Sequence, residues 1–172
     1  MIDLTKDYPL QTESRSVIRF QDCDPLRHLN NAKYFDYFFN AREDQVTQLY
    51  GLHPGDIFKR FGAGWVVYQH HIAYIRPANV GEWVRIFSRV VWFDQDTVIV
   101  EYYMTDDAKQ QLKTVLWTTL KYIEVATGKK TQHHSEVTAY LQKIVFPGPD
   151  VHATNINDRV KDIREELKNP RV

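Results

Sequence analysis

Residues 20–38, FQDCDPLRHLNNAKYFDYF, decide how this chain folds. They place Asp22, Asp24 and His28 within seven positions and then run into an aromatic segment. From residue 32 to about residue 50 the apolar side chains recur with the spacing of one helical face, which predicts a single long helix. The stripe that this helix is expected to bury consists of Phe35, Phe38, Phe39, Val46 and Leu49.

Both ends of this helix carry residues that favour helix termini. Asn30 or Asn31 suits the N-cap, because a short amide side chain accepts a hydrogen bond from a free peptide N–H of the first turn. Gly51 suits the C-terminal end, since glycine adopts the left-handed backbone conformation without strain. A helix over residues 32–50 is therefore expected directly after the acidic motif.

Strands are expected on both sides of this helix. Residues 15–20, RSVIRF, precede it, and runs rich in β-branched and aromatic residues begin at Trp65, Glu82, Thr97 and Gln111. Turn-forming residues separate these runs, and such short connections favour antiparallel neighbours. The order of elements predicts an α+β fold, in which one antiparallel sheet packs against a central helix.

Alternation along two of the runs predicts which side chains face the helix. One face is expected to be buried and the other partly wet. The buried set is Val84, Ile86, Val90 and Trp92 in the second run and Leu112, Leu116, Leu120 and Tyr122 in the fourth; the opposite set is Arg85, Arg89, Lys113 and Lys121.

The composition limits the classes of partner. Lysine plus arginine and aspartate plus glutamate both number 22, so no net field draws the chain to nucleic acid or to an anionic membrane. No segment approaches the roughly 18 to 20 apolar residues that a membrane span needs. A single cysteine, Cys23, leaves neither an internal disulfide nor a cysteine cluster for zinc, which predicts a cytoplasmic protein.

Asp24 and the start of the helix suit acyl transfer. Pro25 holds Asp24 in extended backbone, and the helix that follows offers unpaired N–H groups and partial positive charge. Such N–H groups polarise a carbonyl while a carboxylate activates water or attacks directly, and a thioester needs little proton assistance to its leaving group. Taken alone, however, Asp22 and Asp24 also suit turns, and His28 also suits a polar position beside the helix.

A longer stretch, RFQDCDPLRHLNNAKYFDYFFNARED at residues 19–44, closely resembles the first motif of the hot dog thioesterases, in the 4-hydroxybenzoyl-CoA and acyl-ACP thioesterase branch. HIAYIRPANVGEWVRI at residues 71–86 resembles a second segment of that family, and the resemblance covers about residues 15–125. That branch commonly has asparagine two residues before the histidine. This chain has Leu26 there, so no role for that amide is implied.

The resemblance implies a hot dog fold, with a sheet of five or six strands wrapped around the central helix, and an acyl-CoA or acyl-ACP hydrolase of lipid metabolism. It implies a homodimer or homotetramer with shared active sites, and no cofactor. Asp24 would be the general base or nucleophile, with His28 or Asp22 as orienting groups. The start of the helix would bind the thioester through Asn30, Asn31, Ala32 and Tyr34.

The remaining candidates are weighed against simpler roles. The phosphates of coenzyme A or of the carrier protein would meet cations at strand ends, for which Arg76, Lys129 and Lys130 are candidates. His70 and His71 point to opposite faces of a strand and so do not form a metal site. His133-His134 is not expected to bind a metal either, and Cys23 between two acids is not expected to be a nucleophile.

The chain is expected to divide at residue 132. Residues 1–132 form the hot dog domain, and residues 133–172 form a C-terminal helical extension packed on it, with helices near 136–143 and 157–168. Two rival functions remain. One is a hot dog module that binds acyl-CoA without hydrolysing it; the other is a dehydratase of the same fold, which would need a histidine placed to abstract a proton.

Overall fold

The computed structural model describes residues 2–52 and 55–169. Its sheet is antiparallel, with strand order β1-β3-β4-β5-β2. The elements in chain order are β1 (Thr12–Val17), the short 3-10 helix η1 (Phe20–Asp22), α1 (Lys33–Tyr50), α2 (Asp56–Phe61), β2 (Ala63–Tyr74), β3 (Trp83–Phe93), β4 (Thr97–Asp106), β5 (Leu112–Glu124), α3 (Ser135–Ile144) and α4 (Ile156–Lys168).

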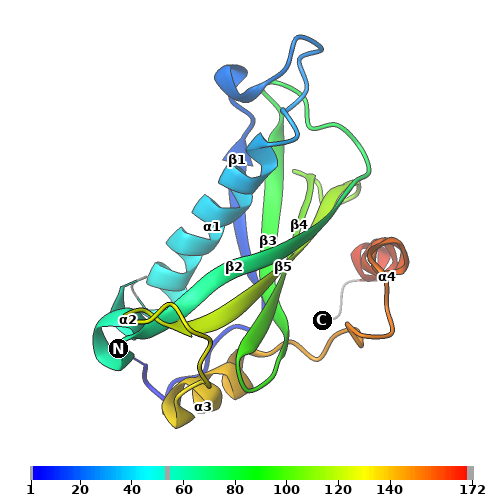
Figure 1. Cartoon of the computed structure of the whole chain (residues 1–172). Coiled ribbons are helices and arrows are strands. Elements are labelled where there is room, and N and C mark those ends of the chain that lie inside the picture. Colours follow the sequence, from blue (N-terminus) through cyan, green and yellow to red (C-terminus); the bar gives the residue numbers. More distant parts are fainter. Residues whose placement is uncertain (1, 53–54, 170–172) are drawn as a thin grey trace.

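The elements form layers on both faces of the sheet (Figure 1). Helix α1 lies along one face, where its rings join the main hydrophobic core with β3, β4 and β5. Helix α4 lies on the opposite face, and α2 and α3 lie together at one end of the sheet. The loop that contains η1 lies at the other end, before α1 begins. The predicted α+β fold, one antiparallel sheet packed on a long helix, is confirmed.

The buried face of α1 is rotated from the predicted stripe. Phe38 is fully buried, whereas Leu49 is 41% exposed and the other three predicted residues are only partly buried. The predicted stripe left out the tyrosines. A tyrosine ring can be buried as fully as a phenylalanine ring when its hydroxyl has a hydrogen-bond partner or faces a cavity. The buried residues of α1 are Tyr34, Tyr37, Phe38, Ala41, Gln45 and Tyr50.

Gly51 ends α1 as predicted. Its backbone is left-handed, with φ of 63°, and its N–H donates to the carbonyl of Val46. At the other end Ala32 occupies the N-cap position, while the Asn30 Oδ1 atom accepts a hydrogen bond of 3.0 Å from the Ala32 N–H. The N-cap predicted at Asn30 or Asn31 is therefore wrong, and Asn30 instead binds the N–H of the N-cap residue itself.

Two β-bulges move side chains to the face opposite the predicted one. The register shifts between Val90 and Trp92, so Trp92 leaves the α1 face and packs edge-on against His152 at 4.8 Å. The register between β4 and β5 also shifts, between Met104 and Thr105. Leu112 therefore lies on the other face of the sheet, in the hydrophobic cluster beneath α4. An extra residue in one strand reverses the alternation beyond it, which simple counting does not detect.

The face predicted to be partly wet is covered by α4. Val160 and Ile163 of this helix pack on Phe87, Tyr103 and Val115 of the sheet. Arg89, predicted to be on the wet face, is only 1% exposed.

The two tail helices are confirmed. Helix α2 was not predicted; it follows His53 and Pro54, which lie outside the described residues.

Among the described residues, no helix is both long enough and apolar enough to span a membrane.

Candidate active site

The acidic motif forms a tight loop at the end of the sheet where β2 finishes. The Asp24 N–H donates to the His28 carbonyl at 2.8 Å, and the Asn30 N–H donates to the Asp22 carbonyl at 2.9 Å. The Leu29 N–H donates to the carbonyl of Ala78, in the connection between β2 and β3. Hydrogen bonds within the loop and to Ala78 thus fix it against the connection between β2 and β3.

The carboxylate of Asp24 is oriented by its own loop. Its Oδ1 atom accepts hydrogen bonds from the peptide N–H groups of Leu26 at 2.9 Å and His28 at 3.1 Å. Arg27 closes this turn with a φ of 64°, an uncommon conformation for a residue other than glycine. The Oδ2 atom makes no hydrogen bond to another described residue. Two N–H groups of the loop therefore fix the orientation of the Asp24 carboxylate.

Asp22 is held differently. Its Oδ2 atom accepts a hydrogen bond of 2.9 Å from the Tyr37 hydroxyl, which in turn accepts one from the Arg19 N–H. Burial raises the pKa of Tyr37 to about 12, and the Asp22 carboxylate contributes to the rise. Asp22 thus fastens the loop to α1, and its predicted role as an orienting group stays a prediction.

His28 and Cys23 flank Asp24 without forming a relay. The His28 backbone bridges to Asn79, and its imidazole has no hydrogen bond to a described residue. Burial raises the pKa of the Cys23 thiol, and the charges of Asp22 and Asp24 add to this, as predicted. The thiol donates to the Arg19 carbonyl at 3.3 Å. A reactive thiolate is therefore disfavoured at this position.

The start of α1 offers fewer donors than predicted. The Ala32 N–H is used by Asn30 Oδ1, and the Lys33 N–H donates to the Asn30 carbonyl at 2.8 Å. The Asn31 N–H makes no bond to a described residue, and its carbonyl accepts from the Tyr74 hydroxyl at 2.8 Å. Of the predicted backbone donors, the Asn31 N–H is therefore the one without a hydrogen-bond acceptor among the described residues.

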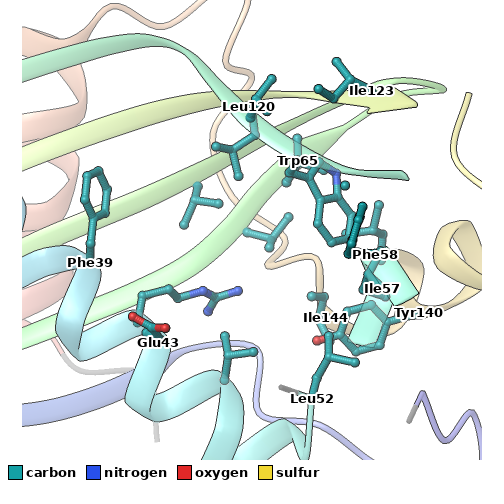
Figure 2. Close-up of a pocket in the computed structure, with 18 of the residues that line it drawn as sticks. Phe39, Glu43, Leu52, Ile57, Phe58, Trp65, Leu120, Ile123, Tyr140 and Ile144 are labelled. Carbon is teal, nitrogen blue, oxygen red and sulfur yellow. The ribbon is translucent and has the colours of Figure 1, made fainter. Parts of the chain in front are cut away.

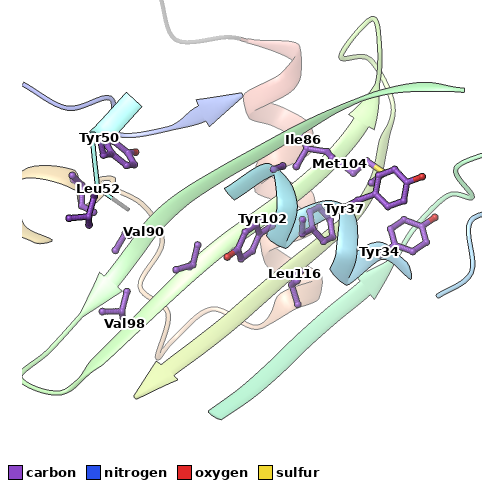
Figure 3. Close-up of a cluster of buried hydrophobic side chains, with 14 of the residues drawn as sticks. Tyr34, Tyr37, Tyr50, Leu52, Ile86, Val90, Val98, Tyr102, Met104 and Leu116 are labelled. Carbon is purple, nitrogen blue, oxygen red and sulfur yellow. The ribbon is translucent and has the colours of Figure 1, made fainter. Parts of the chain in front are cut away.

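Tyr34 points into the core rather than toward the loop surface. Its hydroxyl accepts a hydrogen bond of 3.2 Å from the Ala78 N–H, and its ring packs edge-on against Tyr74. Burial raises its pKa. Figure 3 shows it beside Tyr37 in the buried cluster. The substrate contact predicted for Tyr34 has no support in this position.

The three predicted cations lie at opposite ends of the sheet. Arg76 is exposed in the connection after β2, on the side of the acidic loop. Lys129 and Lys130 follow β5, whose last residue pairs with Ala63 at the start of β2. The 12-residue strand β2 spans roughly 36 Å, and Lys130 pairs with Asp96 at 3.1 Å. One protomer therefore does not bring these cations together.

An apolar pocket of about 530 Å³ opens between α1, the sheet, α2 and α3. In Figure 2, Phe39 of α1, Leu120 of β5, Trp65 of β2 and Tyr140 of α3 point toward a common space. The pocket begins in the middle of α1, and Asp24 is not among its lining residues. In one protomer, therefore, the acid and the pocket lie at different ends of α1.

The histidine pairs have structural roles. His70 lies on the α1 face, with its ring 4.9 Å from that of Phe35, and His71 is exposed beside Gln69. His133 accepts a hydrogen bond from Trp65 Nε1 at 3.0 Å, and His134 caps α3. No group of three or more potential metal ligands is present among the described residues.

The comparisons with known proteins agree with this architecture. The model of the thioesterase-like superfamily matches residues 18–168. The chain belongs to this superfamily. It is 26% identical over 139 residues to the long-chain acyl-CoA thioesterase FadM of Escherichia coli, which covers 79% of the chain and 99% of the relative.

Solved thioesterases share the fold of this superfamily member. The crystal structure of YbaW, a probable thioesterase from Escherichia coli, superposes with a TM-score of 0.67 at 23% identity, covering 79% of this chain and 98% of that one. The 12:0-ACP thioesterase from Umbellularia californica gives 0.72 at 15% identity, covering 86% of this chain and 56% of that one. The predicted hot dog fold and thioesterase class are confirmed.

Proposed function

We propose that the chain hydrolyses acyl thioesters of coenzyme A or of an acyl carrier protein, and that Asp24 acts on the thioester as general base or nucleophile. The observation that carries the proposal is the state of the Asp24 carboxylate. Two peptide N–H groups fix Oδ1, and Oδ2 is left without a partner among the described residues. A carboxylate held in this way is oriented before the substrate arrives.

The reaction follows from this geometry. The Asn31 N–H and the positive end of α1 polarise the thioester carbonyl. Asp24 Oδ2 accepts a proton from water, the water oxygen bonds to the carbonyl carbon, and the tetrahedral intermediate expels the thiolate. The thiolate takes up a proton from Asp24, which leaves the acid and the free thiol. In the nucleophilic variant Asp24 first forms an anhydride, which water then hydrolyses.

The separation of Asp24 from the pocket supports a dimer with shared sites. Strand β2 is an edge strand, paired only with β5, and its Val66, Val67 and Tyr68 are exposed. An exposed edge with apolar side chains is a template for pairing with another strand. Two copies of β2 paired antiparallel about a two-fold axis would place Tyr74, which bonds to Asn31, beside Ala63 of the second copy.

In such a dimer the acidic loop of one protomer lies at the pocket mouth of the other. Gly64, Trp65 and Val66, at the start of β2, line that pocket. Lys129 and Lys130 follow the end of β5, next to the start of β2. The pairing therefore also carries these cations toward the motif of the second protomer. A homodimer built in this way would complete the site, and a tetramer is not required for it.

The decisive experiment measures thiol release by Asp24→Asn. Asparagine keeps an oxygen that can accept the two N–H bonds of the loop, so folding should be preserved. Turnover should fall at least about 1,000-fold, because loss of a base or nucleophile costs roughly that much or more. Asp44→Asn, an exposed acid on α1, is the matched control and should retain full activity. Full activity in the Asp24 variant would falsify the assignment.

The alternative is a module that binds acyl-CoA without hydrolysing it. The observation that favours it is the apolar pocket that lies apart from Asp24 within one protomer. Tight binding of acyl-CoA by the dimer, with no thiol released at any chain length, would support this alternative. The cytoplasmic location and the role in lipid metabolism stay predictions.

A further inference from the structure

A polar cluster in the wall of the apolar pocket has no part in the proposed chemistry of Asp24. It consists of Arg42 on α1, Tyr102 on β4 and Tyr140 on α3, and all three line the pocket. The rest of the lining is almost entirely aliphatic and aromatic (Figure 2). An acyl chain alone needs no cation there, so the cluster calls for a separate explanation.

Arg42 has no anionic partner. It is half-buried, and no carboxylate of the described residues forms an ion pair with it. Glu43, the next residue, also lines the pocket but is exposed and unpaired within the described chain. The contacts of Arg42 are neutral. Its Nη1 atom donates to Ser88 Oγ at 3.3 Å, and its guanidinium lies 5.5 Å from the centre of the Tyr50 ring.

The fully buried arginines, in contrast to Arg42, have carboxylate partners. Arg89 on β3 and Arg159 on α4 both contact the carboxylates of Glu101 and Glu166 within 2.9 Å. A guanidinium stays charged at every physiological pH, and a desolvated charge without a counter-ion is costly. Arg42 departs from this pattern, because it lines an apolar pocket and has no carboxylate partner among the described residues.

The two tyrosines add donors to the same place. Their side chains are 4% and 3% exposed, and neither hydroxyl makes a hydrogen bond to a described residue. Burial raises the pKa of both, that of Tyr102 to about 12, while the charge of Arg42 acts against the rise in each. All three side chains line the same pocket. Both hydroxyls remain protonated and able to donate.

We propose that Arg42, Tyr102 and Tyr140 bind a carboxylate at the end of the acyl group remote from the thioester. The preferred substrates are then thioesters of dicarboxylic acids, whose methylene chain fills the apolar part of the pocket. A planar guanidinium matches a carboxylate through paired N–H groups, and two phenols complete its shell. This inference rests on the proposed hydrolase and names its substrate class.

The test compares two thioesters of equal length, octanoyl-CoA and the mono-CoA thioester of octanedioic acid, by thiol release. The wild-type kcat/KM should be higher for the dicarboxylic substrate. Arg42→Met keeps the aliphatic stem without the charge, and it should lower kcat/KM for that substrate roughly 10- to 100-fold. The value for octanoyl-CoA should change less than about twofold. Arg164→Met, an exposed arginine on α4, is the control and should change neither.

Tyr140→Phe refines the assignment. It removes one hydroxyl and keeps the ring, so the preference should fall by less than for Arg42→Met. A wild-type preference for octanoyl-CoA, or equal losses on both substrates in Arg42→Met, would overturn the inference and leave the hydrolase intact. Loss of turnover on both substrates is the result expected for Asp24→Asn, which tests the proposed hydrolase. Failure of the carboxylate site and failure of the proposed function therefore give different results.

A binding measurement decides the question if no thioester is hydrolysed. Octanoate and octanol have the same chain length and differ in the carboxylate. Octanoate should raise the melting temperature of the wild-type protein more than octanol does, and Arg42→Met should remove the difference. Equal shifts for the two ligands in the wild-type protein would contradict a carboxylate site at Arg42.

Discussion

Asp22 and Asp24 are two positions apart and meet different surroundings. The side chain of Asp22 turns toward α1 and accepts from Tyr37, whereas that of Asp24 folds back over its own loop and keeps one oxygen free. The sequence made Asp24 the catalytic candidate and Asp22 an orienting group, but it did not show what either side chain contacts. Tertiary contacts made the difference, because Tyr37 reaches Asp22 only when α1 packs beside the loop.

His133 couples stability to pH at the level of a single residue. Its Nε2 accepts from Trp65, and its Nδ1 lies 3.0 Å from the Asp94 carbonyl, which requires a proton on Nδ1 and none on Nε2. Burial lowers the pKa of His133 from its ordinary value of 6.5. The folded protein therefore favours the neutral form of the His133 imidazole.

Protonation of His133 should destabilise the fold at mildly acidic pH. Below pH 6.5 His133 binds a proton more readily in the unfolded chain than in the folded one. The stability that the neutral His133 provides is therefore fully present above pH 6.5 and declines as the pH falls. We therefore expect the free energy of unfolding to fall between pH 6.5 and 5.5 because of this residue. Urea titrations at both pH values measure it.

The matched variants for this prediction are His133→Gln and His71→Gln. Glutamine cannot titrate, so the stability of His133→Gln should depend less on pH in this range than that of the wild type. His71 is exposed, and its replacement should leave the dependence unchanged. An identical slope in wild type and His133→Gln would refute the assignment.

At the scale of elements, α4 is bound to the sheet by a buried ionic network. Glu101 on β4 is fully buried and accepts from Arg89, Arg159 and Trp117. Burial alone would raise the pKa of Glu101, but the hydrogen bond from Arg159 and the charges of both arginines hold it below its ordinary range. We propose on this basis that residues 133–172 are an integral part of the domain rather than an appended tail.

Removal of the central charge should therefore cost far more than removal of a surface pair. Glu101→Gln leaves two buried guanidinium groups short of an anion, and we expect a loss of about 3–5 kcal/mol in the free energy of unfolding. Arg15→Gln breaks an exposed pair with Asp107 that solvent screens, and it should cost much less than Glu101→Gln. Urea unfolding measures both. Equal costs would mean that α4 is held by its apolar contacts alone.

Elements were predicted more accurately than the faces they bury. Helix α1, the last four strands and both tail helices lie close to their predicted ranges, because periodicity and turn residues are local signals. The wrong faces have two causes. Bulges displaced Trp92 and Leu112, and α4 buried Arg89, so in each case a distant segment or a strand register overrode the local pattern.

At the scale of the whole molecule, the separation of Asp24 from the pocket leads to a test of shared sites. If each site combines the acid of one protomer with the pocket of the other, two inactive variants can complement each other. Asp24→Asn removes the acid, and Leu120→Trp fills the pocket that Leu120 lines. A mixed dimer of the two variants then contains one site with both parts intact.

Refolded mixtures of the two variants should regain about a quarter of wild-type activity, since random pairing makes half of the dimers mixed and each has one working site. Each variant refolded alone is the control and should stay inactive. No recovery, with mixed dimers demonstrated by differently sized tags, would show that acid and pocket act within one protomer. Sedimentation of the wild-type protein gives the oligomeric state independently.

By itself, the sequence determined the α+β class, the long helix after the acidic loop and the candidate role of Asp24. Spacing, caps and turns are properties of neighbouring residues, and they act before the chain is packed. Only the tertiary structure decided that Asp22 accepts a hydrogen bond from Tyr37, that α4 covers the second face and that Arg42 lines one pocket with two tyrosines. Those contacts join segments far apart in the chain, and their formation depends on the packing of the whole fold.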